Sequence, residues 1–217
     1  MKLATLEHQA RRRHLAVLGG FHPGPEDSAP EGTGTILMLG PDEPGFWPAF
    51  TAAPEYRDGQ PDPMDRWSKR VIGGWAATLG GTALFPSDGP PFAPFYSWAL
   101  RTGRIHASPI RLLVHDAAGL MVSFRGALAL PARLDLPPAP PSPCEGCPAP
   151  CLTACPVEAL SPEHYDLDAC RDWLRGPGTD CMDRGCRARR ACPLSRRHGR
   201  LDAQSAFHMR AFLGPPA

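Results

Sequence analysis

The residues of this chain with the clearest chemistry are its cysteines. All eight lie in the last third of the 217 residues, and none precedes residue 144. They form two groups, each closing in a Cys-Pro pair: Cys144, Cys147, Cys151 and Cys155, then Cys170, Cys181, Cys186 and Cys192. Thiolates are the ligands that zinc and iron–sulfur centres prefer. The clustering therefore predicts a metal site built on thiolates.

The Cys-Pro endings favour iron–sulfur clusters over other thiolate sites. In bacterial two-cluster ferredoxins each cluster takes three cysteines from one run and the fourth from the other. The same crossed arrangement here predicts two [4Fe-4S] clusters that use all eight thiols. The first would be held by Cys144, Cys147, Cys151 and Cys192, and the second by Cys155, Cys170, Cys181 and Cys186.

Other interpretations of the cysteines stay open. Three residues separate Cys147 from Cys151, where the usual ferredoxin run has two, and Cys170 lies in a helix-like stretch where it would also serve as a small core residue. Zinc, or one cluster with spare thiols, is an alternative, although zinc ribbons usually separate their two knuckles by ~15–20 residues. Disulfides require an oxidising compartment. Residues 1–30 do not have the pattern of a secretory signal, so we expect a cytoplasmic protein.

Composition limits the classes of partner. The 23 basic and 22 acidic residues nearly cancel, so overall charge gives no reason to expect nucleic acid or an anionic membrane. No apolar run approaches the ~20 residues that a membrane-spanning helix needs. The 28 prolines favour short elements joined by extended connections.

A proline-rich segment divides the chain. Five of the eight residues in 136–143 are proline, which neither a helix nor a central strand accommodates. We expect an α+β sheet domain over 1–136, a linker over 137–143 and a ferredoxin-like iron–sulfur domain with a C-terminal helix over 144–217.

Hydrophobic periodicity predicts the elements of the first domain, which we expect to be α+β around a mostly antiparallel sheet. The predicted helices span 3–14, 63–79 and 95–101, and the predicted strands 35–39 and 83–85. Residues 110–115 and 120–130 are expected to form a hairpin through the turn 116–119. The aromatic residues are expected in the core: Phe46, Trp47, Phe50, Trp67, Trp75, Phe92, Phe95, Tyr96 and Trp98.

The order of these motifs resembles a known family. A Ser87-Asp88-Gly89-Pro90 turn lies between a strand and a helix, a hairpin with Ser123 to Leu128 follows, and a Cys-bearing helix at 168–174 precedes the last Cys-Pro. Over most of residues 35–195 this layout resembles epoxyqueuosine reductase. The resemblance implies two four-iron clusters and, more distantly, a nitroreductase-like sheet domain that holds a cobalamin, as in reductive dehalogenases. The stretch from Phe85 to Leu128 also resembles short bacterial ferredoxin-like proteins.

The sequence departs from that family at two points. The family's turn carries its proposed acid two residues before the glycine, where this chain has Ser87, and Asp88 is displaced by one position. Asp88 is equally typical of an ordinary turn or helix cap. The helical repeats that grip tRNA in the family do not follow the second cysteine group, so tRNA is not an expected substrate.

Arginines crowd the second cysteine group: Arg184, Arg187, Arg189, Arg190, Arg196, Arg197 and Arg200. They would dock an acidic redox partner, form a solvated charged face, or bind phosphate.

Three hypotheses for function result. The chain is an electron carrier that serves a redox partner protein; or it is an oxidoreductase, fed by the clusters, whose sheet domain binds cobalamin or flavin and a small-molecule substrate; or it is a metal-stabilised structural or nucleic-acid-binding module.

Overall fold

The protein is an α+β chain organised as two compact units. The computed structural model describes residues 1–177 and 179–214. Unit 1 comprises Met1–Ile105 and Ser123–Pro140, and unit 2 comprises His106–Val122 and Pro141–Ala217. Residues 106–122, which the sequence pattern placed in the sheet domain, thus belong with the cysteine-bearing segment. Residues 133–142 form no helix or strand.

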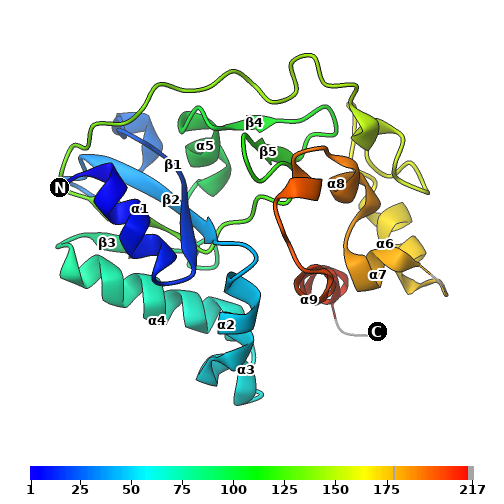
Figure 1. Ribbon diagram of the computed structural model, residues 1–217, viewed down its shortest axis with the longest axis horizontal. Coiled ribbons are helices and arrows are strands. Elements are labelled where there is room, and N and C mark those ends of the chain that lie inside the picture. Colours follow the sequence, from blue (N-terminus) through cyan, green and yellow to red (C-terminus); the bar gives the residue numbers. More distant parts are fainter. Residues whose placement is uncertain (178, 215–217) are drawn as a thin grey trace. The chain divides into compact units, whose positions relative to one another are not determined.

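The core of unit 1 is a four-stranded antiparallel sheet (Figure 1). Its order is β1 (Leu15–Phe21), β2 (Thr35–Pro41), β6 (Gly126–Leu130) and β3 (Thr82–Leu84). Every residue of the two central strands, β2 and β6, is buried. Their continuous apolar sequences are what a strand covered on both faces requires. The predicted α+β class with an antiparallel sheet is confirmed.

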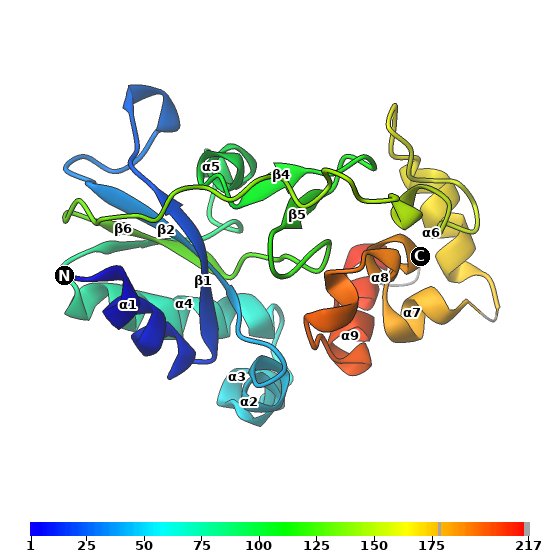
Figure 2. The ribbon, with the colours of Figure 1, turned by 45° about the horizontal axis from the view of Figure 1, so that its top comes forward.

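Three helices cover this sheet. They are α1 (Leu3–Arg11), α4 (Pro63–Thr78) and α5 (Phe95–Arg101). Figure 2 shows α1 and α4 below the sheet and α5 above it. The apolar stripe of α4 faces inward, and the indole Nε1 of Trp75 donates to Gln9 Oε1 of α1 at 2.9 Å. The apolar spacing that predicted α4 therefore also explains which face it buries.

Two short helices, α2 (Phe46–Ala52) and α3 (Pro54–Arg57), extend the apolar core of unit 1. The rings of Phe46 and Trp67 meet edge to face with centroids 5.2 Å apart, a favourable aromatic geometry. The prediction that all nine aromatic residues are buried is wrong for two of them. Phe92 is 62% exposed because it lies in the proline-rich turn before α5. Tyr96 is 52% exposed because it lies on the side of α5 opposite to its buried residues.

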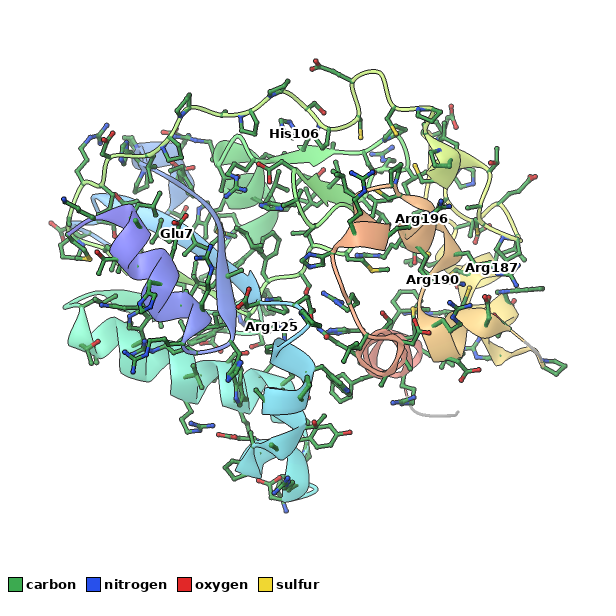
Figure 3. All side chains as sticks on the ribbon, in the orientation of Figure 1. Glu7, His106, Arg125, Arg187, Arg190 and Arg196 are labelled. Atoms are coloured by element: carbon green, nitrogen blue, oxygen red, sulfur yellow. The ribbon has the colours of Figure 1, made fainter. Side chains whose placement is uncertain are left out.

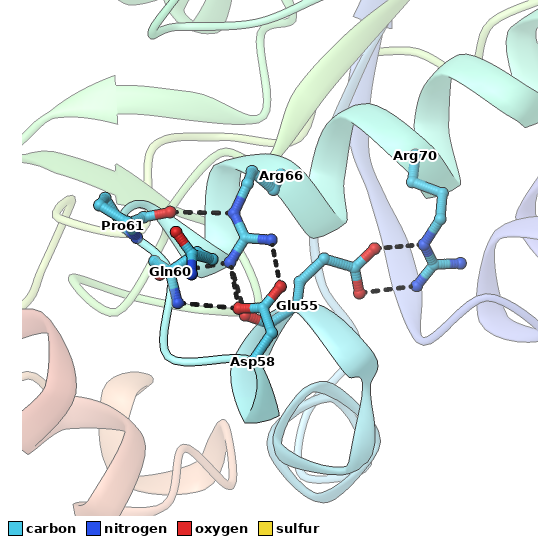
Figure 4. A network of polar contacts seen from close by, with 6 residues as sticks. All are labelled: Glu55, Asp58, Gln60, Pro61, Arg66 and Arg70. Atoms are coloured by element: carbon cyan, nitrogen blue, oxygen red, sulfur yellow. Dashed lines mark hydrogen bonds and ion pairs between the residues drawn. The ribbon is translucent and has the colours of Figure 1, made fainter.

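A polar network fastens α3 to the first turns of α4 (Figure 4). The Arg66 guanidinium donates to both carboxylate oxygens of Asp58, at 2.7 and 2.8 Å, and to the carbonyl of Pro61 at 2.9 Å. Arg70 forms a bidentate pair with Glu55. These arginines hold the connection that leads into α4, because each bonds to groups of the preceding turn.

Unit 2 is made of short elements around the cysteines. They are β4 (Ile105–Ala107), whose first residue still belongs to unit 1, β5 (Leu113–His115), η2 (Pro150–Leu152), α6 (Leu167–Arg175), α7 (Asp180–Arg184), α8 (Arg187–Ala191), η3 (Ser195–Arg197) and α9 (Asp202–Leu213). The turn η1 (Pro25–Asp27) belongs to unit 1. The predicted C-terminal helix is α9, and it packs against α7.

The predicted hairpin between 110–115 and 120–130 is wrong. Strand β5 pairs with β4, and β6 pairs with β2 and β3. Only the turn itself is closed, by reciprocal bonds of 3.0 and 2.9 Å between His115 and Gly119. The Leu120 N–H donates to Ser195 Oγ at 2.9 Å, so this N–H does not pair with a neighbouring strand.

We expect Trp98 to be a principal source of stability in unit 1. It is fully buried, and its indole Nε1 donates to the Asp27 carbonyl at 2.8 Å. Trp98→Ala should lower the free energy of unfolding by about 3–5 kcal/mol, because it leaves a large cavity. Tyr96→Ala, on the exposed side of the same helix, should change it by no more than about 0.5 kcal/mol. Urea unfolding followed by circular dichroism measures both, and equal losses would contradict the role assigned to Trp98.

Candidate metal centre

All eight cysteines lie in unit 2, and all are free thiols. Cys144 and Cys147 lie in turns before η2, Cys151 lies in η2, and Cys155 follows it. In the second group, Cys170 lies in α6, Cys181 in α7, and Cys186 and Cys192 flank the two ends of α8. Short helices and the turns around them therefore carry the thiols, and Cys170 lies in a helix as the sequence predicted.

An apolar cluster of unit 2 contacts several of the thiols. Cys151 and Cys192 are buried in this cluster, Cys144 and Cys186 pack against it, and η2 packs on α8. Burial raises the pKa of the Cys144 thiol, and the nearby thiolates of Cys147, Cys151 and Cys192 raise it further. The same causes raise the pKa of Cys151. These four thiols thus lie close enough to influence one another's charge.

The other four thiols form a second set. Burial raises the pKa of the Cys170 thiol; Tyr165 donates a hydrogen bond that lowers it, and the charges of Cys186, Cys155 and Cys181 raise it. The Tyr165 hydroxyl lies 3.9 Å from Cys170 Sγ. Burial also raises the pKa of Cys186, and Cys181 adds to this.

These two sets have the composition that crossed ligation requires. The first set combines the first three cysteines of the chain with Cys192, which belongs to the second sequence group. The second set combines Cys155, from the first sequence group, with Cys170, Cys181 and Cys186. The folded chain brings together the thiols that the spacing paired. Their ligation of a metal stays a prediction.

Cys192 has the environment most favourable to a thiolate. Burial opposes its charge, but the backbone N–H groups of Ser195, Leu120 and Leu194 and the Ser195 hydroxyl donate to the sulfur, and together they lower its pKa. Ser195 is 5% exposed and is itself fixed by its bond from the Leu120 N–H. Ser195 was not among the residues predicted from the sequence. Its position three residues after Cys192 is the one signal that the sequence offers for it.

The described residues contain no preformed site for a single metal ion. Among residues 1–177 and 179–214, no group of three or more His, Cys, Asp or Glu side chains is arranged to hold one. A tetrahedral zinc site holds each sulfur ~2.3 Å from the same ion. In a four-iron cluster each thiolate binds a different iron atom, so the sulfurs surround the cluster instead of meeting at one point.

Asp88, the displaced acid of the Ser87-Asp88-Gly89-Pro90 turn, is engaged in an ion pair. Its carboxylate lies 2.6 Å from Lys69 Nζ, and both side chains are half exposed. Its N–H donates to the Phe85 carbonyl at 3.2 Å. Asp88 therefore has the contacts of an ordinary turn residue.

Comparison with known proteins adds no identity. No protein-family model matches the chain, and no curated protein and no solved structure matches it either. The likeness to epoxyqueuosine reductase stays a prediction from the sequence. None of the helices in the described part of the chain is long and apolar enough to cross a membrane.

Gly119 is required by the approach of the chain to Ser195. It has φ +58°, and a Cβ at this position would lie 2.5 Å from Ser195 N and 2.8 Å from Ser195 Oγ. We expect Gly119→Ala to destabilise unit 2 by about 1–3 kcal/mol, because it adds a steric clash to the strain of a positive φ. Gly146→Ala is the matched control.

Gly146 has φ +70° but nothing within 4 Å of the Cβ position. Its substitution should cost only the backbone strain, about 1 kcal/mol. Urea unfolding of both variants, followed by near-ultraviolet circular dichroism, gives the comparison. If Gly119→Ala lowers the free energy of unfolding by no more than Gly146→Ala does, the steric clash at Gly119 is ruled out.

Proposed function

We propose that the chain is an iron–sulfur electron-transfer protein that carries two [4Fe-4S] clusters in unit 2. The supporting observation is the grouping of its eight thiols into two sets, each with three cysteines from one sequence group and one from the other. Crossed sharing of this kind is characteristic of two-cluster ferredoxins.

The donor chemistry fits the clusters. All eight donors are free thiols, and Cys144, Cys151, Cys186 and Cys192 contact apolar side chains. Sites made only of thiolates select iron–sulfur clusters or zinc among biological metals. Cys144, Cys147, Cys151 and Cys192 would hold one cluster, and Cys155, Cys170, Cys181 and Cys186 the other.

The surrounding residues would tune these sites. When bound, such clusters accept and release single electrons. The N–H groups of Leu120, Leu194 and Ser195 stabilise negative charge on the sulfur of Cys192, and those of Ala188 and Arg189 do so for Cys186. Hydrogen bonds to sulfur and local positive charge both favour the reduced, more negative state.

Within this proposal unit 2 is a ferredoxin-type domain and unit 1 a nitroreductase-like sheet domain that recognises a redox partner. A reductase with cobalamin or flavin in unit 1 is the second hypothesis, and a metal-stabilised structural or nucleic-acid-binding module is the third. The ion pair between Asp88 and Lys69 supports a turn role for Asp88, so no proton-donating residue is assigned to the second hypothesis.

Two double substitutions test the crossed ligation. Each removes two thiols, so both variants carry the same loss of donors. Cys144→Ala with Cys192→Ala removes two ligands of one proposed cluster and should leave about four irons per chain. Cys144→Ala with Cys155→Ala removes one ligand from each cluster and should leave almost none.

Iron and acid-labile sulfide are measured after anaerobic purification. If each cluster used the cysteines of only one sequence group, the two results would be exchanged. Zinc in place of iron in the unsubstituted protein would overturn the proposal and favour the third hypothesis. A corrinoid or flavin that binds to the iron-loaded protein and is reduced by it would favour the second.

Ser195 should tune the cluster at Cys192. Ser195→Ala removes the hydroxyl donor and the acceptor of the Leu120 N–H. We expect the potential of one cluster to become more negative by about 20–60 mV, since a hydrogen bond contributes ~1 kcal/mol and a tenfold change for one electron is ~59 mV.

A redox titration followed by electron paramagnetic resonance measures this shift. The control is Ser161→Ala, whose hydroxyl bonds to Glu163 and His164 in a local turn. Its potentials should equal those of the unsubstituted protein. A Ser195→Ala protein with unchanged potentials would contradict the assigned role.

A further inference from the structure

Unit 2 contains a cavity whose walls are dominated by arginine. Its volume is about 460 Å³. Figure 3 labels three of its residues, which come from α8 and η3: Arg187, Arg190 and Arg196. Arg184, Arg200 and Asp202 complete the charged lining. We call this cavity the arginine pocket. It uses five of the seven arginines around the second cysteine group.

The arginine pocket has an excess of positive charge. Asp202 lines it and pairs with Arg184, and Asp180 pairs with both Arg187 and Arg190. Five guanidinium groups against these two carboxylates leave three positive charges in excess. The charge of Arg200 also contributes, after burial, to lowering the pKa of His198 to about 4.

Several of these guanidinium groups are held in place. The Arg190 side chain is only 22% exposed, and it donates to Asp180 Oδ2 at 2.7 Å and to the Gly185 carbonyl at 3.1 Å. Arg200 donates to the carbonyl of Met121 at 2.8 Å. A solvated charged face would not need such fixed contacts. Fixed donors lower the ordering cost of binding a ligand.

Donors remain for a ligand. Arg184 and Arg187 reach their carboxylates through Nε, at 3.0 and 2.6 Å. Within the described residues nothing bonds to the terminal amino groups of these two side chains. Arg196 forms no ion pair in the part of the chain that the structure describes, and its Nε donates only to the Arg190 carbonyl, at 3.4 Å.

We infer that the arginine pocket binds a small ligand with two linked phosphoryl groups. Arginine matches phosphate oxygens with paired N–H donors, and two phosphoryl groups supply charge close to the excess in the pocket. The volume lies within the range of about 300–1,000 Å³ that is usual for small-molecule sites, and it exceeds what one phosphate ion needs. The inference does not depend on the clusters, because every contact it uses lies between side chains and backbone of unit 2.

Isothermal titration calorimetry of the purified full chain with inorganic pyrophosphate tests the site. We expect saturable one-to-one binding that is tighter than the binding of inorganic phosphate. Arg196→Gln should weaken it at least tenfold, and Arg187→Gln, which also removes a partner of Asp180, should do the same. Because Arg196 is exposed, its substitution should leave the circular dichroism spectrum unchanged.

Arg175→Gln is the matched control. Arg175 lies on α6, is exposed and pairs with Asp172 at 3.0 Å, outside the arginine pocket. Arg175→Gln removes one positive charge, as Arg196→Gln does. The pyrophosphate affinity of the Arg175→Gln protein should equal that of the unsubstituted protein. Equal weakening by Arg175→Gln and Arg196→Gln would reduce the effect to overall charge and overturn the site.

Three further titrations define the ligand class. Binding of adenosine diphosphate with similar affinity, lost in Arg196→Gln, would support the site and identify a nucleotide as its source of the diphosphate group. Citrate that binds as tightly as pyrophosphate would overturn the phosphate assignment. If a single-stranded RNA oligonucleotide binds and pyrophosphate does not, the proposed site is overturned and the arginines form a nucleic-acid-binding surface.

Discussion

The contacts around Cys192 connect the two segments of chain that form unit 2. The N–H groups of Leu120, Leu194 and Ser195 help to lower the pKa of its thiol, and the Leu120 N–H donates to Ser195 Oγ at 2.9 Å. Leu120 lies in the segment 106–122 and the others in the cysteine-bearing segment. These bonds therefore join the two stretches of chain that make the unit. Gly119 permits the approach because any side chain there would meet Ser195.

Four other thiols differ from Cys192 in the direction in which their pKa is shifted. Burial raises the pKa of Cys144, Cys151, Cys170 and Cys186, which favours their neutral form over the thiolate. A metal centre needs thiolates, so its binding must release protons and would add its own stability to that of the folded unit. The apolar cluster around Cys151 and Cys192 is small, and two of its seven buried members are cysteines. Such a unit has much to gain from metal–thiolate bonds.

The two units differ in how much of their structure could be predicted from the sequence. Helices α4 and α5 and strand β2 follow from local patterns, because an apolar stripe or a continuous apolar run reports the faces that an element buries. Strand partners do not. Residues 110–115 and 126–130 have the apolar content of strands, yet pairing depends on contacts far along the chain. The turn at 116–119 leads into the bond with Ser195 instead of a hairpin.

The same division applies to the candidate sites. The cysteine spacings predicted two sets of thiols through the crossed ligation of two-cluster ferredoxins, and that ligation stays a prediction. The donors around Cys192 are mostly backbone N–H groups, which every residue but proline carries, so no sequence signal marks them. The arginines were visible as a basic stretch. Only their side-chain contacts separate the five that line the arginine pocket from Arg189, which donates to the Leu120 carbonyl at 2.8 Å.

Mössbauer spectroscopy of the anaerobically purified, iron-57-labelled full chain tests the central claim most directly. Together with iron and sulfide measurements it reports both the number and the type of iron centres. Two four-iron clusters predict about eight irons and eight sulfides per chain, with spectra of [4Fe-4S] centres that change on reduction by dithionite. A stoichiometric zinc content without iron, or iron without acid-labile sulfide, would contradict it.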